Sequence, residues 1–227
     1  VLEHMIDCSL MLEASTDSHF RMVRSQKNRF GAVNELGVFA MTDRGLKEVS
    51  NPSAIFLQRD SEVSPGSVVT STWEGSRPLL VELQALVSDS ALGNPRRVTV
   101  GLDQNRLSML LAVLQRHGGI MVGDQDVYVN VVGGIKILET SADLALILCV
   151  LSSLRNLSLP SDLLVLGEVG LAGEIRPVVN GQERMREAEK HGFRCAIVPV
   201  ANNPKNKMKK MKVIAVKRLT DAMDVFF

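Results

Sequence analysis

The sequence predicts a protein of the α/β (α+β) class with a mixed sheet and packed helices, because strand and helix patterns alternate along most of the chain. Apolar residues make up 45% of the 227 residues, enough for a sizeable core. The 26 Lys and Arg residues nearly balance the 25 Asp and Glu residues, so the net charge of +1 exerts no global pull on nucleic acid. No apolar run approaches the ~20 residues that span a bilayer, and Glu3, His4 and Asp7 argue against a signal peptide. We therefore expect a cytoplasmic protein with no membrane partner.

Metal binding is not expected. The three cysteines are far apart and form no C-x-x-C pair, which argues against a disulfide framework or a zinc site and favours buried free thiols. No two of the four histidines show ligand spacing. These residues are Cys8, Cys149, Cys195, His4, His19, His117 and His191.

The first sixty residues carry short strand patterns. Apolar residues at 5–12 and 19–24 flank a polar turn, and residues 39–41 and 46–49 flank Thr42-Asp43-Arg44-Gly45, so each pair predicts two adjacent strands. Asn51-Pro52 predicts a short helix to about Leu57, since a capping side chain precedes a first-turn proline. Residues 59–66 are polar and end in Pro-Gly, which predicts a domain boundary.

After this boundary, strands and helices alternate. An apolar spacing of i, i+3, i+4 and i+7 starting at Leu107 predicts an amphipathic helix that ends at Gly118-Gly119. Residues 141–154 are apolar nearly all round, which predicts a buried central helix, and a further helix is expected at 182–191. The expected strands are 67–73, 79–87, 127–132, 163–167, 196–200 and 213–216.

The segment Lys27-Asn28-Arg29-Phe30-Gly31 follows a predicted strand and combines two cations with an aromatic ring. Lys27 and Arg29 suit contact with a phosphate, because Arg offers a planar fork of donors and Lys a point charge. A solvated basic turn with Phe30 packed into the core explains the same composition. The residues alone favour this second interpretation.

The run KNRFG, with AVNELGVFAM and NPSAIFL after it, closely resembles the signature of the bacterial RadA (Sms) family of DNA-repair ATPases, which is related to RecA. The resemblance continues through NPRRV, GLDQNRL, VNVVGG, ETSADLAL, GEVGLAGEIRPV and HGFRCAIVP. It implies that residues 1–60 are the last strands of a RecA-like ATPase core and that residues 66–227 form a Lon-protease-like domain. It also implies a ring, expected to be a hexamer, in which Lys27 and Arg29 touch the nucleotide of a neighbouring subunit.

The family's phosphate-binding loop is absent from this sequence. Walker A needs a glycine directly before its lysine, and none of the 17 glycines here precedes a lysine. The resemblance implies ATP with Mg²⁺, and zinc on four cysteines, only in an N-terminal part that the sequence lacks. We therefore expect no cofactor in this chain and no ATPase activity from it alone.

Peptidases of the Lon family use a Ser–Lys dyad, in which a neutral lysine takes the serine proton. The resemblance places Ser141 at the nucleophile position and Gln182 at the lysine position, and a glutamine amide has no useful basicity. Lys190 lies eight residues further along and Lys136 precedes Ser141 by five, so neither is expected to replace it. Ser141 or Thr140 capping its own helix is the plainer interpretation. The sequence thus predicts a degenerate dyad in a non-proteolytic domain.

Two groups of cations are candidate contacts for the DNA backbone. Five lysines crowd eight residues after Asn202-Asn203-Pro204 and would add a salt-sensitive term to binding, although a solvated loop explains them equally well. Three arginines near the Leu107 helix form the second group, although Arg97 is also suited to pair with Asp103 or Glu82. No aromatic residue is interleaved with either group, so base stacking is not expected. The candidates are Lys205, Lys207, Lys209, Lys210, Lys212, Arg96, Arg97 and Arg106.

The resemblance implies a role in DNA repair and homologous recombination. The parent would be a DNA-dependent ATPase that drives branch migration of recombination intermediates, with single-stranded or branched DNA and a RecA-type recombinase as partners. This chain would supply the KNRFG motif and a scaffold that holds the ring and guides DNA. Two alternatives remain: a serine peptidase that uses Ser141, and an assembly or partner-binding module that never touches DNA.

Overall fold

The computed structural model describes residues 4–14, 20–31, 36–49, 57, 64–75, 77–90 and 93–227, beginning with a four-stranded antiparallel sheet in the order β1-β2-β3-β4. Asp43 and Arg44 form the turn between β3 and β4, as the sequence predicts, and Gly45, the first residue of β4, has a positive φ of 103°. A glycine with positive φ is typical of the residue that follows a hairpin turn of this kind. The predicted helix from Asn51-Pro52 and most of the predicted boundary fall outside the described residues. The strands are β1 (Cys8–Ala14), β2 (Phe20–Asn28), β3 (Leu36–Thr42) and β4 (Gly45–Glu48).

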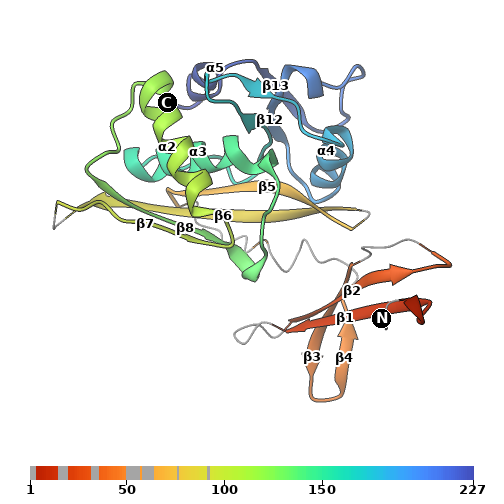
Figure 1. The fold of residues 1–227 in the computed structure, drawn as a ribbon. Helices are drawn as coiled ribbons and strands as arrows, with labels where there is room; N and C mark the ends of the chain where they lie inside the picture. The colour runs from red at the N-terminus through yellow and green to blue at the C-terminus, as the bar shows by residue number, and fades with distance from the viewer. Residues whose placement is uncertain are drawn as a thin grey trace.

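The larger part of the chain is built on a seven-stranded mixed sheet with the order β13-β12-β9-β5-β6-β8-β7 (Figure 1). Strands β5, β6 and β8 pair antiparallel, and the other neighbouring pairs are parallel, so the α/β class with a mixed sheet is confirmed. The strands are β5 (Ser67–Glu74), β6 (Arg77–Asp89), β7 (Arg97–Val100), β8 (Gln125–Val131), β9 (Leu163–Val165), β12 (Cys195–Pro199) and β13 (Lys212–Val216).

Helices cover both faces of this sheet. Alternate residues of a strand point to opposite faces, and in β9 Leu163 belongs to the main core under α2, α3 and α5, whereas Leu164 belongs to a second core under α4. Helix α2 begins where Asp103 accepts the backbone N–H of Arg106 and ends at Gly119, which has a positive φ of 69°. The helices are α2 (Gln104–Gly118), α3 (Asp143–Arg155), α4 (Gly181–Lys190) and α5 (Leu219–Met223).

The buried central helix is confirmed, with a change at its start. The predicted helix at 141–154 becomes a 3₁₀ turn, η3 (Thr140–Ala142), followed by α3, in which the first ten residues are buried. A two-stranded ribbon of β10 (Glu168–Val169) and β11 (Ile175–Arg176) was not predicted, because strands of two residues carry no period. The ribbon lies beside the start of α3, where it helps to form the candidate site.

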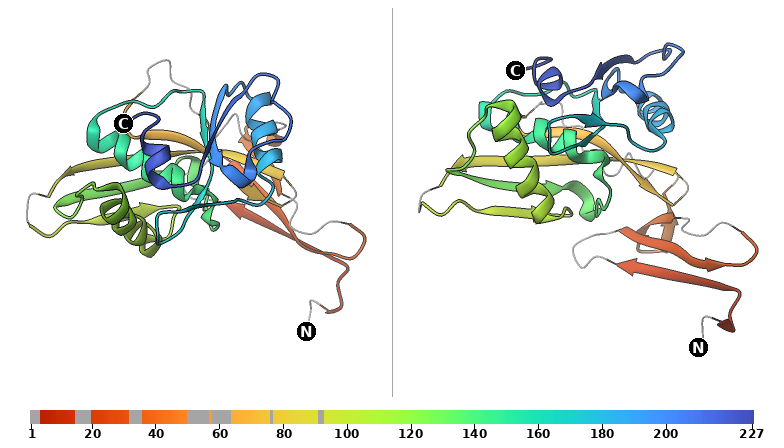
Figure 2. Two further views of the ribbon diagram at one scale, coloured as in Figure 1. Left: turned by 90° about the horizontal axis from the view of Figure 1, so that it is seen from above. Right: turned by 45° about the horizontal axis from the view of Figure 1, so that its top comes forward.

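The small sheet lies to one side of the seven-stranded sheet and its helices (Figure 2). Arg24 of β2 reaches Glu74 at the end of β5 with an N–O distance of 3.0 Å, and Met22 and Val49 pack against the main core. These contacts connect the small sheet to the larger unit. Among the described residues, no helix is both long and apolar enough to cross a bilayer.

Candidate functional site

Ser141 lies in the 3₁₀ turn η3, where the chain passes from an extended segment into α3. Its side chain is buried, and its hydroxyl donates to the Ser71 carbonyl of β5 at 3.3 Å. The helix-capping interpretation of Ser141 and Thr140 is wrong, because α3 has Ala142 at its N-cap and no side-chain cap. Thr140 donates instead to the Glu168 carboxylate on β10 at 2.7 Å. Both hydroxyls therefore bind neighbouring elements rather than their own helix.

The side chain that faces Ser141 is Arg184 of α4, which sequence reasoning missed. Its guanidinium is only 1% exposed and donates to both carboxylate oxygens of Glu139 at 2.7 Å, to the Ser71 carbonyl and to the Ser141 hydroxyl at 3.3 Å. It also lies over the Trp73 ring, 5.6 Å from the centroid. We call Ser71, Glu139, Ser141 and Arg184 the Arg184 cluster.

The electrostatics of the Arg184 cluster exclude a base at Ser141. Burial raises the pKa of Glu139, but the hydrogen bonds and charge of Arg184 outweigh it and hold that pKa below its usual value. A guanidinium does not lose its proton in proteins, so Arg184 cannot accept one from Ser141. The cluster is a hydrogen-bonded ion pair rather than a nucleophile with its base.

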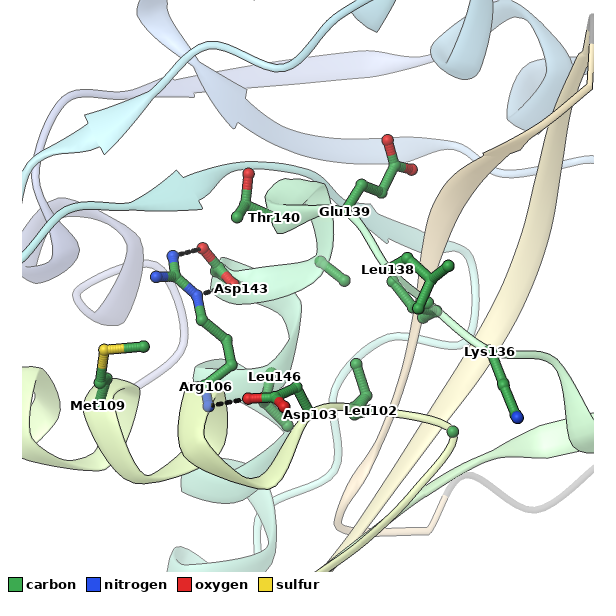
Figure 3. Close-up of a pocket in the computed structure, with 13 residues that line it drawn as sticks. Leu102, Asp103, Arg106, Met109, Lys136, Leu138, Glu139, Thr140, Asp143 and Leu146 are labelled. Carbon is green, nitrogen blue, oxygen red and sulfur yellow. Dashed lines mark hydrogen bonds and ion pairs between the residues drawn. The ribbon is translucent and has the colours of Figure 1, made fainter.

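The predicted dyad residues do not meet. Gln182 is exposed on α4, beside a polar hollow that also involves Arg186, so it points away from the buried side of this helix. Lys190 pairs with Glu187 at 3.1 Å. Lys136 is exposed and, in Figure 3, points away from Glu139. In the part of the chain that the structure describes, no lysine replaces the missing base.

A groove of about 480 Å³ lies on the other side of η3, between the start of α2 and residues 136–140 (Figure 3). Its lining includes Thr140, Ala142 and Asp143 but not Ser141. At its base Arg106 of α2 binds the buried Asp143 carboxylate through two guanidinium nitrogens. Burial raises the pKa of Asp143, although Arg106 and the Val169 backbone N–H oppose the shift. The groove therefore opens next to Ser141 without giving access to its hydroxyl.

Two of the arginines expected to contact DNA bind groups inside the domain. The Arg97 guanidinium donates to the carbonyls of Val122, at 2.7 Å, and Gln125, and it pairs with neither Asp103 nor Glu82. Arg106 is held by Asp143 and also donates to the Val169 carbonyl. Both side chains are therefore held by acceptors within the domain, Arg97 by backbone carbonyls and Arg106 by a carboxylate. Arg96 remains exposed on the surface.

The lysine-rich segment lies over α4. It runs from the 3₁₀ turn η4 (Val200–Asn202) to β13, and Asn202 fixes its start by exchanging two hydrogen bonds with the Val178 backbone at 2.8 and 2.9 Å. Near its end the Lys210 backbone N–H donates to Glu189 of α4 at 2.6 Å. The hollow between segment and helix, about 560 Å³, is bordered by Arg186, Lys190, Lys205, Lys207 and Lys209. Lys210 and Lys212 are exposed beside it.

The KNRFG segment ends β2 and turns outward. The Arg29 backbone N–H donates to the Asp7 carbonyl at 2.9 Å, and its guanidinium pairs with the Asp7 carboxylate at the same distance. The Asn28 side chain accepts the Phe30 backbone N–H at 3.1 Å, and a Cβ on Gly31 would lie only 2.8 Å from the Asn28 amide. Phe30 is 84% exposed, so its expected burial in the core is wrong.

The cysteines are only partly as expected. Cys149 is buried, and burial raises the pKa of its thiol, but Cys8 is exposed and Cys195 half-buried. Within the described ranges, no group of three or more His, Cys, Asp or Glu side chains is suited to hold a metal ion. His117 lies in the last turn of α2, and its ring Nε2 hydrogen-bonds with the Leu171 carbonyl at 3.0 Å.

The fold and the site define a mixed α/β domain in which a buried serine, Ser141, contacts a buried arginine, Arg184. The chain is 67% identical over 226 residues to the DNA repair protein RadA of Escherichia coli and 45% identical over 225 residues to that of Bacillus subtilis. These matches cover 100% and 98% of the chain and 49% of each relative. The chain is thus similar to RadA proteins along its entire length, and the resemblance identified from KNRFG and the collinear blocks is confirmed.

A second comparison covers a shorter stretch. The sequence profile of a family described as "Subunit ChlI of Mg-chelatase" matches residues 93–202, from just before β7 to η4. The RadA proteins of Salmonella typhimurium and Pseudomonas aeruginosa are 68% and 67% identical to the chain. The chain spans about half the length of the curated relatives it matches.

Replacing Arg184 tests the Arg184 cluster. We expect Arg184→Ala to lower the free energy of unfolding by about 3 kcal/mol, because it leaves Glu139 without its partner and the Ser71 carbonyl without a charged donor. Gln182→Ala, on the exposed side of the same helix, should change it by less than about 0.5 kcal/mol. Urea unfolding followed by circular dichroism measures both, and equal losses would contradict the assignment.

A fluorophosphonate probe tests the chemistry of Ser141. Because the hydroxyl is buried and binds Ser71 and Arg184, we expect labelling of the native chain no higher than that of Ser141→Ala. A serine hydrolase in the same reaction serves as the positive control. Labelling that is lost in Ser141→Ala would show a reactive serine and would reinstate the peptidase alternative.

Proposed function

We propose that the chain acts in DNA repair and homologous recombination as part of a RadA-type protein. The observation that carries this proposal is the match along the whole chain to proteins named DNA repair protein RadA. In this proposal the longer protein is a DNA-dependent ATPase that drives branch migration of recombination intermediates. Residues 1–60 contribute the end of its RecA-like core, and residues 66–227 form a Lon-like scaffold that does not cleave peptides.

The KNRFG segment is proposed to act on a neighbouring subunit. Phe30 exposes an aromatic ring on a turn that Asp7 and Asn28 hold in place, which suits insertion into another protein surface. Contacts between two different surfaces of identical chains close into rings when the rotation per subunit allows it. Lys27 and Arg29 would then reach a nucleotide bound by the next subunit, as in a trans-acting arginine finger.

The lysine-rich segment is proposed to contact the DNA backbone. Its exposed cations border one hollow together with Arg186 and Lys190 of α4, so the positive charges around this volume outnumber the one carboxylate in its lining, Glu189. Phosphate contacts of this kind are independent of sequence and weaken as salt rises. Since no aromatic side chain lines this hollow, the proposal involves the backbone and not the bases.

The remaining partners belong to the same proposal. We place ATP with Mg²⁺, and a zinc ion, in the part of RadA proteins outside this chain, and we expect a hexameric ring on single-stranded or branched DNA. A recombinase of the RecA type is the expected protein partner, and the cytoplasm the expected location. The geometry of the Arg184 cluster supports a scaffold role and disfavours a peptidase.

The trans-acting role predicts the effect of two substitutions in a full-length RadA that carries this chain. We expect Lys27→Ala and Arg29→Ala each to lower DNA-stimulated ATP hydrolysis at least about tenfold, because a trans arginine stabilises charge that develops in the transition state. Lys47→Ala, an exposed lysine of β4 in the same sheet, should leave hydrolysis unchanged. Unchanged hydrolysis in the two motif variants would remove the trans-acting assignment.

The DNA contact predicts a change in salt dependence. We expect Lys205→Gln with Lys207→Gln to weaken binding to single-stranded DNA and to reduce the slope of log K against log salt by up to about 1.4, or about 0.7 for each lost phosphate contact. Lys47→Gln with Lys217→Gln, two exposed lysines elsewhere, should leave the slope unchanged. Fluorescence anisotropy at several salt concentrations measures both, and equal slopes would exclude this segment from the interface.

Assembly is tested by light scattering on the chain with and without single-stranded DNA, at low and moderate salt. We expect a species of several chains whose mass shifts with DNA, because the scaffold is proposed both to hold the ring and to touch DNA. A monomer indifferent to DNA would assign both roles to the part of RadA outside this chain.

A further inference from the structure

Arg24 joins the small sheet to the seven-stranded sheet. Its guanidinium pairs with the Glu74 carboxylate at the end of β5, and the two side chains are only 29% and 14% exposed. Arg24 also lies 3.9 Å from the Glu13 carboxylate, but this second partner belongs to the small sheet itself. A charge-assisted hydrogen bond that is partly shielded from water holds its partners more firmly than an exposed ion pair does.

The face of the small sheet around Arg24 is otherwise apolar. Met22 lies on the same face of β2, since alternate residues of a strand point the same way, and it pairs in register with Val38 of β3. Val38 is buried in the main core, and Met22 and Val49 pack against that core. Apolar burial favours contact but has no directional preference. The ion pair therefore adds the orientation that the apolar contacts do not supply.

Strand β2 carries this anchor to the KNRFG segment. Arg24 lies three residues before Lys27, within about 10 Å along an extended strand. Apart from one bulge, the pairing of β2 with β1 continues to the end of the strand, where Asn28 faces Cys8. Because both strands are hydrogen-bonded along this stretch, a shift of Arg24 moves Lys27 with it.

The other end of the ion pair is anchored as well. Glu74 follows Trp73, whose backbone N–H donates to the Glu139 carboxylate at 2.8 Å and whose ring lies under the Arg184 guanidinium. The pairing of β5 with β6 extends to Glu74, which faces Arg77. Helix α4 and the segment before η3 thus hold the end of β5 through the Arg184 cluster.

We propose that Arg24 and Glu74 are positioning residues, whose ion pair fixes the KNRFG segment relative to the domain formed by residues 66–227. This inference rests on the proposed function, in which Lys27 and Arg29 act on the nucleotide of a neighbouring subunit. A displacement of about 1 Å at a group that contacts reacting atoms is enough to lower a rate substantially. The ion pair therefore lets the domain that holds the ring set the reach of the two cations.

The first experiment measures this position in the 227-residue chain without using its activity. One nitroxide label is attached to Cys8, which is exposed and faces the end of β2, and the other to Gln115→Cys on the exposed side of α2. Cys195→Ser removes the half-buried thiol, and the remaining native cysteine is buried. Double electron–electron resonance then gives the distribution of distances between the two units.

We expect this distribution to broaden at least about twofold in Arg24→Gln and in Glu74→Gln, since apolar contacts alone do not fix an orientation. Glu13→Gln is the matched control, because it removes the carboxylate that Arg24 meets within the small sheet. Circular dichroism melts verify that the variants fold. A distribution of unchanged width and mean in both Arg24→Gln and Glu74→Gln would overturn the positioning role.

The second experiment measures hydrolysis in a full-length RadA that carries this chain. We expect Arg24→Gln and Glu74→Gln each to lower kcat for DNA-stimulated ATP hydrolysis at least about fivefold and to change KM for ATP less than about twofold, because the displaced cations act on the transition state. The double variant should lose no more than either single variant, because each removes the same contact. Additive losses would show two independent effects and would overturn the pair as one unit.

The outcomes separate this inference from the proposed function. Full hydrolysis in Arg24→Gln together with reduced hydrolysis in Lys27→Ala would overturn the positioning role and leave the trans-acting role intact. Full hydrolysis in both variants would overturn the trans-acting role, and the distance measurement would then decide the positioning role by itself.

Discussion

The arrangement around the candidate site depends on one buried ion pair, between Arg184 and Glu139. A guanidinium that is 1% exposed needs a carboxylate and further acceptors to offset the loss of water, and it finds them on β5 and in the segment before η3. The pair thereby joins α4 to both elements. Arg184 lowers the pKa of Glu139 in the folded chain, so the ion pair stabilises the fold fully at pH values above the pKa that Glu139 has in the unfolded chain. This stabilisation is lost as the pH falls through the lower pKa of Glu139 in the folded chain. The raised pKa of Asp143 has the opposite effect on the pH dependence of stability, because protonation of this carboxylate relieves the cost of burying its charge.

The tight turn η3 separates the groove from the Arg184 cluster. Thr140, Ala142 and Asp143 border the groove, whereas the intervening Ser141 points into the Arg184 cluster, where its hydroxyl is occupied on both sides. A lysine at the position of Arg184 would be able to lose its proton after burial, but a guanidinium keeps its charge. Ser141 therefore lies beside a charged donor and lacks a base.

The sequence predicted features whose cause is local and missed those that depend on distant partners. The turn at Asp43-Arg44 and the end of α2 at Gly119 follow from residue types within a few positions, so both were predictable. Arg184 was missed because its partners in the Arg184 cluster are 43 to 113 residues away, and only the Val179 carbonyl, five residues back, is a local partner. The local sequence signal is its place on the buried face of α4 with Met185 and Ala188. The spacing of residues likewise does not predict the partners of Arg97, which lie far along the chain. Nor does it predict that Phe30 is exposed.

The KNRFG segment is organised before any partner binds. Arg29 donates to the Asp7 carbonyl and pairs with the Asp7 carboxylate, and the Asn28 side chain accepts the Phe30 backbone N–H. Docking of the Phe30 side chain on a partner would therefore fix few further backbone dihedrals. The Arg29–Asp7 pair is exposed and therefore weak, about 1 kcal/mol or less, so a nucleotide phosphate with greater charge can displace the carboxylate at small cost. A segment with a fixed backbone and a weakly held guanidinium thus combines a low entropy cost of docking with an arginine that remains available for exchange.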